Sequence, residues 1–232
     1  MAAAVLAGAA ALGGLSAAAA PATASADGGA CVSGPLGSAS IGSASCSSTG
    51  RSTAIAIGPN ATATASGKGN LSLAVGDTAK ASAIGTRNLA AALGNHTGVA
   101  AGTGTRNIAT AVGPNSGAIA GTGNRNIATS FGTNAGALAQ GGNRNIASSF
   151  GRNGGAVAEV GNGNRAASVG SDSGSIASGG NNNRAFTLGR KSGSTAKTGN
   201  RNVATTVGTN SSAAASGGGQ RTTVVGNNQH KP

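Results

Sequence analysis

The sequence predicts an all-β protein that winds as a parallel β-solenoid, or β-roll, with about 19 residues per coil. Three observations lead to this prediction: a repeat that keeps its length, short alternating runs between turn residues, and a composition that excludes an ordinary core. Each coil is expected to hold two short strands and two turns. Coils stacked about 4.8 Å apart would form a rod in which equivalent residues lie in rows.

The repeat is clearest in glycine. Seven glycines recur at every nineteenth position without a slip, at Gly94, Gly113, Gly132, Gly151, Gly170, Gly189 and Gly208. Before Gly94 the half-units are all nine residues long, as in KGNLSLAVG, whereas later units divide into nine and ten residues. Roughly nine coils are therefore expected between Thr53 and Gly226, with the disturbed spacing near the end marking a terminal coil.

The strands are predicted from side chains that alternate over about five residues, as in IATSF at Ile127–Phe131. Glycine, asparagine or proline interrupts such runs every few residues, which disfavours helix. Because bulky apolar groups gain most from burial, we expect them inside and the Ala/Asn/Ser face outside. The expected inward rows are Ile108, Ile127, Ile146 and Val203; Val112, Phe131, Phe150, Val169, Leu188 and Val207; and Ile119, Leu138, Val157 and Ile176.

The composition supports a thin rod. The 232 residues include 43 Gly and only three aromatic side chains, and charged residues are 9 % of the chain against about 25 % in ordinary soluble domains. Glycine does not recur at every third position, so a collagen helix is excluded. Disorder stays open as an alternative, because chains rich in Gly, Ser, Asn and Ala can remain unfolded.

The N-terminus reads as an export signal. Residues 1–26 hold an Ala-rich apolar run that ends in Ala24-Ser25-Ala26, which fits the small-x-small rule of signal peptidase. No Lys or Arg precedes the run, so an uncleaved anchor is the alternative. The mature chain is expected to be secreted, or held at the cell surface or cell wall, with no integral membrane segment.

Two cysteines follow the proposed cleavage site. Cys31 and Cys46 are predicted to form a disulfide, as an even pair in an exported protein most simply does. Residues 27–50 are interpreted as an N-terminal cap with this Cys pair, residues 51–226 as the solenoid repeats, and residues 227–232 as a C-terminal tail.

The segment Thr53–Leu93, with AIAIGPNATATASG, LSLAVG and ASAIG, resembles the left-handed β-roll head repeats of YadA-like trimeric autotransporter adhesins. The resemblance is close over about forty residues and implies a homotrimer that binds host surfaces or extracellular matrix. No heptad stalk follows the repeats, so it implies the head architecture and not the autotransport mechanism. The composition also looks like that of small secreted repeat proteins of high-GC actinobacteria.

Two polar rows follow the repeat. The Arg row is predicted to line one edge of the rod as a basic stripe for a polyanion, or as solvated turn residues that keep rods apart. Its members are Arg87, Arg106, Arg125 and Arg144, continued approximately by Arg165, Arg184 and Arg201. The Asn row is interpreted as structural, with stacked amides that hydrogen-bond between coils. Its members are Asn107, Asn126, Asn145, Asn164, Asn183 and Asn202.

The chain contains few side chains of the types that act in catalysis. The only acids are Asp27, Asp77, Glu159 and Asp172, and none of them recurs with the period of the glycines. We therefore expect no enzyme, no metal site and no cofactor. Nucleic acid is not expected as a partner, because too few aromatic side chains are present to stack on bases.

The predicted function is that of a non-catalytic secreted or cell-surface repeat protein with a structural or adhesive role, possible as a homo-oligomer. Two alternatives stay open. One is a rod that binds a polyanion of the cell envelope, glycan or lipid, through the Arg row. The other is a fibre former, because the GxNxA element is distantly similar to curli-type repeats.

Overall fold

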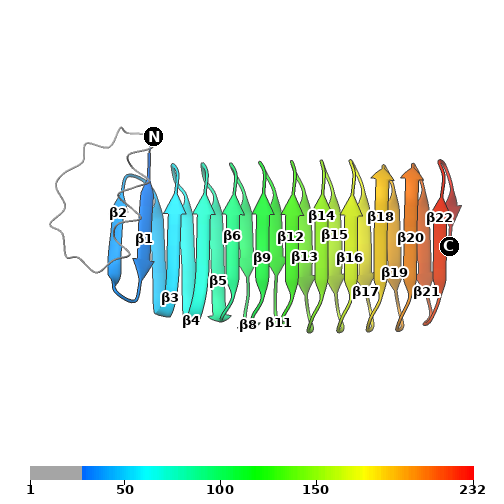
Figure 1. The fold of residues 1–232 in the computed structure, drawn as a ribbon, viewed down its shortest axis with the longest axis horizontal. Coiled ribbons are helices and arrows are strands. Elements are labelled where there is room, and N and C mark those ends of the chain that lie inside the picture. The colour runs from blue at the N-terminus through cyan, green and yellow to red at the C-terminus, as the bar shows by residue number, and fades with distance from the viewer. Residues whose placement is uncertain (1–27) are drawn as a thin grey trace.

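The computed structural model describes residues 28–232 and shows a straight rod of about ten coils (Figure 1). Every regular element in this part of the chain is a β-strand, from β1 to β23. The prediction of an all-β parallel solenoid with about 19 residues per coil is confirmed. The predicted signal peptide and its cleavage site lie outside the described residues.

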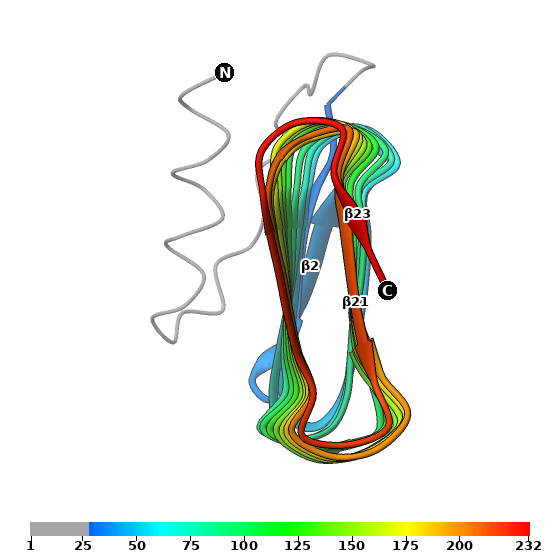
Figure 2. The ribbon, with the colours of Figure 1, turned by 90° about the vertical axis from the view of Figure 1, so that its right-hand side faces the viewer.

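Each coil contributes one strand to each of two facing sheets, so the rod seen along its axis is a flattened oval (Figure 2). Sheet 1 contains β2 (Gly37–Ile41), β1 (Ala30–Gly34), the second halves of β3 (Ser45–Ile57) and β4 (Thr62–Val75), β6 (Leu89–Leu93), β9 (Ile108–Val112), β12 (Ile127–Phe131), β14 (Ile146–Phe150), β16 (Arg165–Val169), β18 (Arg184–Arg190), β20 (Val203–Thr209) and β22 (Arg221–Val225).

Sheet 2 contains the first halves of β3 and β4, then β5 (Lys80–Thr86), β7 (Gly98–Ala101), β10 (Gly117–Ala120), β13 (Gly136–Gln140), β15 (Gly155–Glu159), β17 (Gly174–Ser178), β19 (Gly193–Lys197), β21 (Ser212–Ser216) and β23 (His230–Lys231). The two-residue strands β8 (Gly104–Thr105) and β11 (Gly123–Asn124) lie in the turns that lead from sheet 2 to sheet 1.

The parallel register pairs equivalent residues of successive coils. Ile127 of β12 pairs with Ile146 of β14, and Phe131 pairs with Phe150 at the other end of the same strands. The coil becomes longer by one position near the N-terminal end, as the pairing of Leu71 with Leu89 and then of Leu89 with Ile108 shows. The added residue falls in the turn after sheet 2.

The interior of the rod is made of alanine and small polar residues, so the prediction that bulky side chains point inward is wrong. In β12 it is Ala128 and Ser130 that are fully buried, whereas Phe131 is 38 % exposed. Sheet 2 behaves in the same way, since Ala118 and Ala120 are buried on either side of Ile119, which is 44 % exposed. The rows of Ile, Leu, Val and Phe therefore cover the outside.

The reason for this inversion is the narrow space between the sheets. The disulfide that spans the interior joins Cys31 of sheet 1 to Cys46 of sheet 2 with Cα atoms 5.8 Å apart. Farther along the rod, the hydroxyl of Ser175 in sheet 2 lies 2.8 Å from that of Thr187 in sheet 1. Ordinary packed sheets stand about 10 Å apart and hold large side chains between them. Here alanine, serine and threonine already fill the gap.

Glycine sits where the chain enters each turn. Gly132 has φ 141°, and a Cβ on it would lie 1.8 Å from the carbonyl oxygen of Gly151 in the next coil. Gly123, at the other end of the flattened coil, has φ 113° and would meet Gly142 at the same distance. Because an L side chain is excluded by both conformation and space, the regular spacing of glycine is a requirement of coil stacking.

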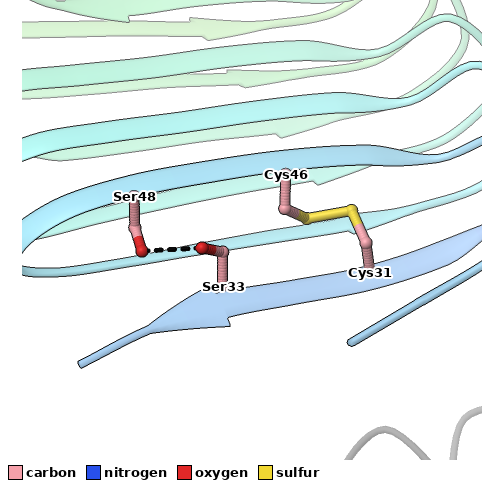
Figure 3. Close-up of a disulfide and its surroundings, with 4 residues drawn as sticks. All are labelled: Cys31, Ser33, Cys46 and Ser48. Carbon is pink, nitrogen blue, oxygen red and sulfur yellow. Dashed lines mark hydrogen bonds between the residues drawn. A yellow bond between two sulfur atoms is a disulfide. The ribbon is translucent and has the colours of Figure 1, made fainter. Parts of the chain in front are cut away.

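The N-terminal end is closed by an antiparallel hairpin. β1 pairs antiparallel with the second half of β3 on one side and with β2 on the other. The predicted disulfide between Cys31 and Cys46 is confirmed, and beside it Ser33 hydrogen-bonds to Ser48 at 2.7 Å (Figure 3). The first coil begins at Ser45, inside the segment that we assigned to the cap, because the first half of β3 already pairs in parallel with β4.

The C-terminal residues also take part in the solenoid. His230 and Lys231, in the predicted tail, pair in parallel with Ser212 and Ala213 of β21. Within residues 28–232 there is no helix of the length and apolarity needed to span a membrane.

Candidate functional site

The turns form two edges along the rod. The first edge consists of the turns from sheet 1 to sheet 2, such as Gly132-Thr133-Asn134-Ala135. The second edge consists of the turns from sheet 2 to sheet 1, such as Gly123-Asn124-Arg125-Asn126. The second edge brings together most of the polar residues that the sequence analysis selected.

The inner Asn row of the second edge is fully buried and bonds to the main chain of the neighbouring coils. The Oδ1 atom of Asn107 accepts a hydrogen bond from the backbone N–H of Asn126 at 2.9 Å, and its Nδ2 donates to the carbonyl of Gly123 at 2.9 Å. The same pattern recurs coil after coil in Asn126, Asn145, Asn164, Asn183 and, with an altered turn, Asn202. The amides bridge coils through backbone groups rather than by stacking on one another.

A second Asn row, which sequence reasoning missed, runs along the outside of the same edge. Asn124 donates from Nδ2 to Oδ1 of Asn143 at 3.1 Å, and Asn143 donates to Asn162 at the same distance. The row continues to Asn181 and Asn200. The signal for it was present in the sequence, since these residues recur with the same period, two places before the inner Asn row.

Between the two Asn rows stands the Arg row. Arg106, Arg125 and Arg144 have φ values of 59°, 59° and 60°, and Arg87 and Arg201 lie in the same left-handed region. The equivalent positions of other coils hold residues suited to this conformation, Gly69, Gly163 and Asn182. For a side chain such as arginine the left-handed region costs roughly 1 kcal/mol or more per residue.

Two of the predicted members do not belong to this row. Arg165 and Arg184 are the first residues of β16 and β18 on the outer surface of sheet 1, where Arg165 pairs with Ile146 and Arg184 with Val203. The difference is one of phase. Arg165 comes two positions later in its coil than Arg144 does in the preceding one, so Gly163 takes the turn position and the arginine moves onto the strand.

Three arginines of the row line a groove on the second edge. The groove has a volume of about 590 Å³ and is lined by Arg106, Arg125 and Arg144 together with Thr105, Asn124, Asn143 and Asn162. We call it the Arg groove. No acidic residue of the described chain lines the groove: Asp77 and Asp172 are on the first edge, and Glu159 ends β15, where the chain enters the second edge.

The second notable surface is the outside of sheet 1, which we call the apolar face. Its outward side chains are mainly Ile, Leu, Val and Phe on ten successive strands from β3 to β22. Phe131 and Phe150 stack there with ring centroids 5.3 Å apart and planes at 9°. The outside of sheet 2 is flatter, because many of its strands begin with glycine, as at Gly117 and Gly136, and it is more polar, because strands end in residues such as Gln140, Glu159 and Lys197.

Among residues 28–232, no three His, Cys, Asp or Glu side chains come close enough to hold a metal ion. What these residues do offer is two extended surfaces, one cationic and one apolar.

Taken together, these features define a parallel β-solenoid repeat protein. Comparison with protein-family models, with curated proteins and with solved structures finds no match to this chain.

Proposed function

We propose that this chain is a non-catalytic structural or adhesive protein, secreted or held at the cell surface, that associates with a second copy through its apolar face. One observation supports the proposal above all. The large apolar side chains lie on the outside of the rod, and on sheet 1 they form two rows along its length, with mainly Ala, Ser and Thr between them. Contiguous apolar surface beyond a few hundred Å² marks interaction sites in soluble proteins.

The size of the face suits a contact between two copies. Ten strands about 4.8 Å apart, each with five residues of about 3.3 Å, give a face of roughly 800 Å². A stable protein–protein interface buries about 800 Å² per partner. The face is also flat, so two copies can pack as the two sheets of a sandwich do.

The charges on the face are compatible with this contact. Arg165, Arg184 and Arg221 each start a strand of sheet 1, next to the second edge. From this rim position the guanidinium groups reach solvent while their aliphatic stems cover apolar surface. Packing of two copies therefore does not require a buried unpaired charge.

The adhesive role and the export are supported by two further features. The Cys31–Cys46 disulfide fits an oxidising compartment. The resemblance of Thr53–Leu93 to adhesin heads is the reason for proposing adhesion. That resemblance implies a trimer, whereas the area of the apolar face favours a pair. N-terminal sequencing of exported protein tests the leader, with Asp27 expected as the first residue.

Sedimentation velocity tests the association. The wild type is expected to sediment with twice the mass of one chain. The variant Phe131→Gln/Phe150→Gln, on the apolar face, is expected to sediment as a monomer with an unchanged far-UV circular dichroism spectrum.

A matched control is Ile119→Gln/Ile176→Gln on sheet 2, where both side chains are as exposed as the two phenylalanines. This control is expected to keep the wild-type mass. A wild type that stays monomeric at high concentration would contradict the proposal. A mass of three chains would replace the pair by the trimeric arrangement of the adhesin heads.

A further inference from the structure

We infer that the Arg groove binds a linear anionic polysaccharide that runs along the rod axis. This site lies on the second edge, away from the apolar face, and it does not depend on the association proposed above. Four properties of the groove support the inference: its unused hydrogen-bonding groups, the backbone conformation of its arginines, its charge spacing and its lack of aromatic side chains.

The hydrogen-bonding groups of the groove that remain free for a ligand are donors. Oδ1 of Asn143 accepts from both the backbone N–H and the Nδ2 of Asn124, and Oδ1 of Asn162 accepts in the same way from Asn143. Each of these amides therefore spends its acceptor within the row and keeps a second N–H of Nδ2. Guanidinium groups have only donors. A ligand for this surface must supply oxygen acceptors.

The conformation of the arginines points to selection for something other than folding. Arg106, Arg125 and Arg144 occupy the left-handed region, which Gly163 and Asn182 occupy at lower cost in later coils. Such strain is found at ligand-binding sites, but this chain also has it at Thr78 and Val160, so it supports the inference only together with the charge and the hydrogen-bonding groups of the groove. An arginine at this turn position is exposed and lies between the two Asn rows.

The spacing of the charges favours a polymer. Consecutive arginines of the groove stand one coil apart, so their Cα atoms repeat at about 4.8 Å. Like charges at that separation repel one another even in water. A chain of regularly placed carboxylates or sulfates relieves this repulsion in every coil, whereas a single small anion relieves it in one.

The mixture of donors favours a polysaccharide over a nucleic acid. Arginine pairs with acidic groups, and the neutral amides of the outer Asn row suit hydroxyl and ring oxygens. Proteins that hold single-stranded nucleic acid stack its bases on aromatic side chains. The groove lining contains none, and Phe131, Phe150 and Phe186 all lie on strands of sheet 1.

The test uses the wild-type chain and two triple variants. The groove variant is Arg106→Asn/Arg125→Asn/Arg144→Asn. Asparagine suits the left-handed turn, as Asn182 shows at the same position, so this variant is expected to fold. The control is Arg152→Asn/Arg190→Asn/Lys191→Asn on or beside the first edge, and both variants lower the net charge from +12 to +9 (12 − 3 = 9).

Binding is measured to heparin, to polygalacturonate and to an oligo(dT) of similar charge, at two salt concentrations. The wild type is expected to bind the two polysaccharides, more weakly at the higher salt concentration. The groove variant is expected to bind them at least about tenfold more weakly, and the control to bind as the wild type does. Binding of heparin but not of polygalacturonate would show that the site prefers sulfated chains. Binding of both would show that it accepts anionic polysaccharides in general. Either result supports the inference.

Three results would overturn the inference. One is an equal loss in the groove variant and the control, because binding would then follow net charge alone. Another is tighter binding of oligo(dT) than of either polysaccharide, which would make the edge a nucleic-acid surface. The third is no binding by the wild type. The sedimentation experiment has its own readout, so failure here is distinguishable from failure of the proposed association.

Discussion

The two edges of the rod reverse the chain in the same way but with different residues. On the first edge the left-handed position is most often asparagine, as at Asn115, Asn134 and Asn153. On the second edge the same conformation is held by arginine in Arg87, Arg106, Arg125, Arg144 and Arg201. On the second edge Gly69, Gly163 and Asn182 hold the same conformation, so the turn by itself does not require arginine. The comparison separates what the solenoid requires from what a ligand would require.

The buried residue of each turn differs as well. In several coils the first edge uses a short hydroxyl, as at Ser116, whose single proton is shared between the carbonyls of Gly132 and Pro114, and in others an alanine, as at Ala135. The second edge uses an amide, and Asn126 donates to Gly142 and Thr122 and accepts from Asn145. The amide is present before the coil becomes longer, since Asn70 already donates to Ser66 and Gly85 and accepts from Asn88, so it belongs to the second turn of both the shorter and the longer coils.

The largest expected effect concerns the glycines that both edges share. Gly132→Ala places a Cβ 1.8 Å from a backbone oxygen at a positive φ, so we expect a loss of at least about 3 kcal/mol or failure to fold. Gly136→Ala in β13 is the control, because nothing lies within 4 Å of its Cβ and its φ is unstrained. That change is expected to be neutral or stabilising by up to about 1 kcal/mol. Urea unfolding measures both, and equal losses would contradict the stacking requirement.

A smaller effect tests the difference between the buried residues. Asn126→Ala removes three hydrogen bonds and leaves the backbone N–H of Asn145 buried without its acceptor, so we expect a loss of about 2–4 kcal/mol. Ser116→Ala on the first edge removes only the bonds of one hydroxyl, and about 1 kcal/mol is expected. Equal free energies of unfolding for the two variants would show that the amide has no special role in the second turn.

The smallest effect concerns Val160, in the extra position of the second edge. It has φ 51° and is 60 % exposed, whereas Gly141 and Gly179 occupy the equivalent places with φ 69°. A β-branched residue is poorly suited to this conformation. Val160→Asn is expected to stabilise by about 1 kcal/mol and to raise the melting temperature by a few degrees. The control Val160→Ala relieves less strain and should raise it less, and a lower melting temperature for the Asn variant would contradict this reasoning.

Much of the architecture could be predicted from the sequence. The spacing of Gly94 to Gly208 gave the coil length, the alternation in Ile127–Phe131 gave the strands, and the Cys31–Cys46 pair gave the disulfide. In a solenoid each coil repeats the period of the sequence. The coil length and the rows of equivalent residues can therefore be predicted without knowledge of tertiary contacts. The outer Asn row had the same periodicity and was within reach of the same reasoning.

The orientation of the strands was not predictable in this way. Alternation distinguishes two faces of a strand and does not say which of them is buried, and transfer free energies alone place Phe131 and Ile127 inside. The sheets lie so close that only Ala128 and Ser130 fit between them. The two-place shift of Arg165 and Arg184 to the Ile position is visible in the sequence, and the pairing of β16 and β18 shows that this position is on the outer surface of sheet 1.

The sequence by itself determined the period of the coil, the turns that glycine and asparagine allow, and the residues that stack into rows. Only the tertiary structure decided which rows are inside. The distance between the sheets is set by the short turns and by interlocking small side chains, and that distance excludes the large apolar residues from the interior. The same decision created the apolar face, and the turn geometry that accompanies it put the arginines of the second edge side by side.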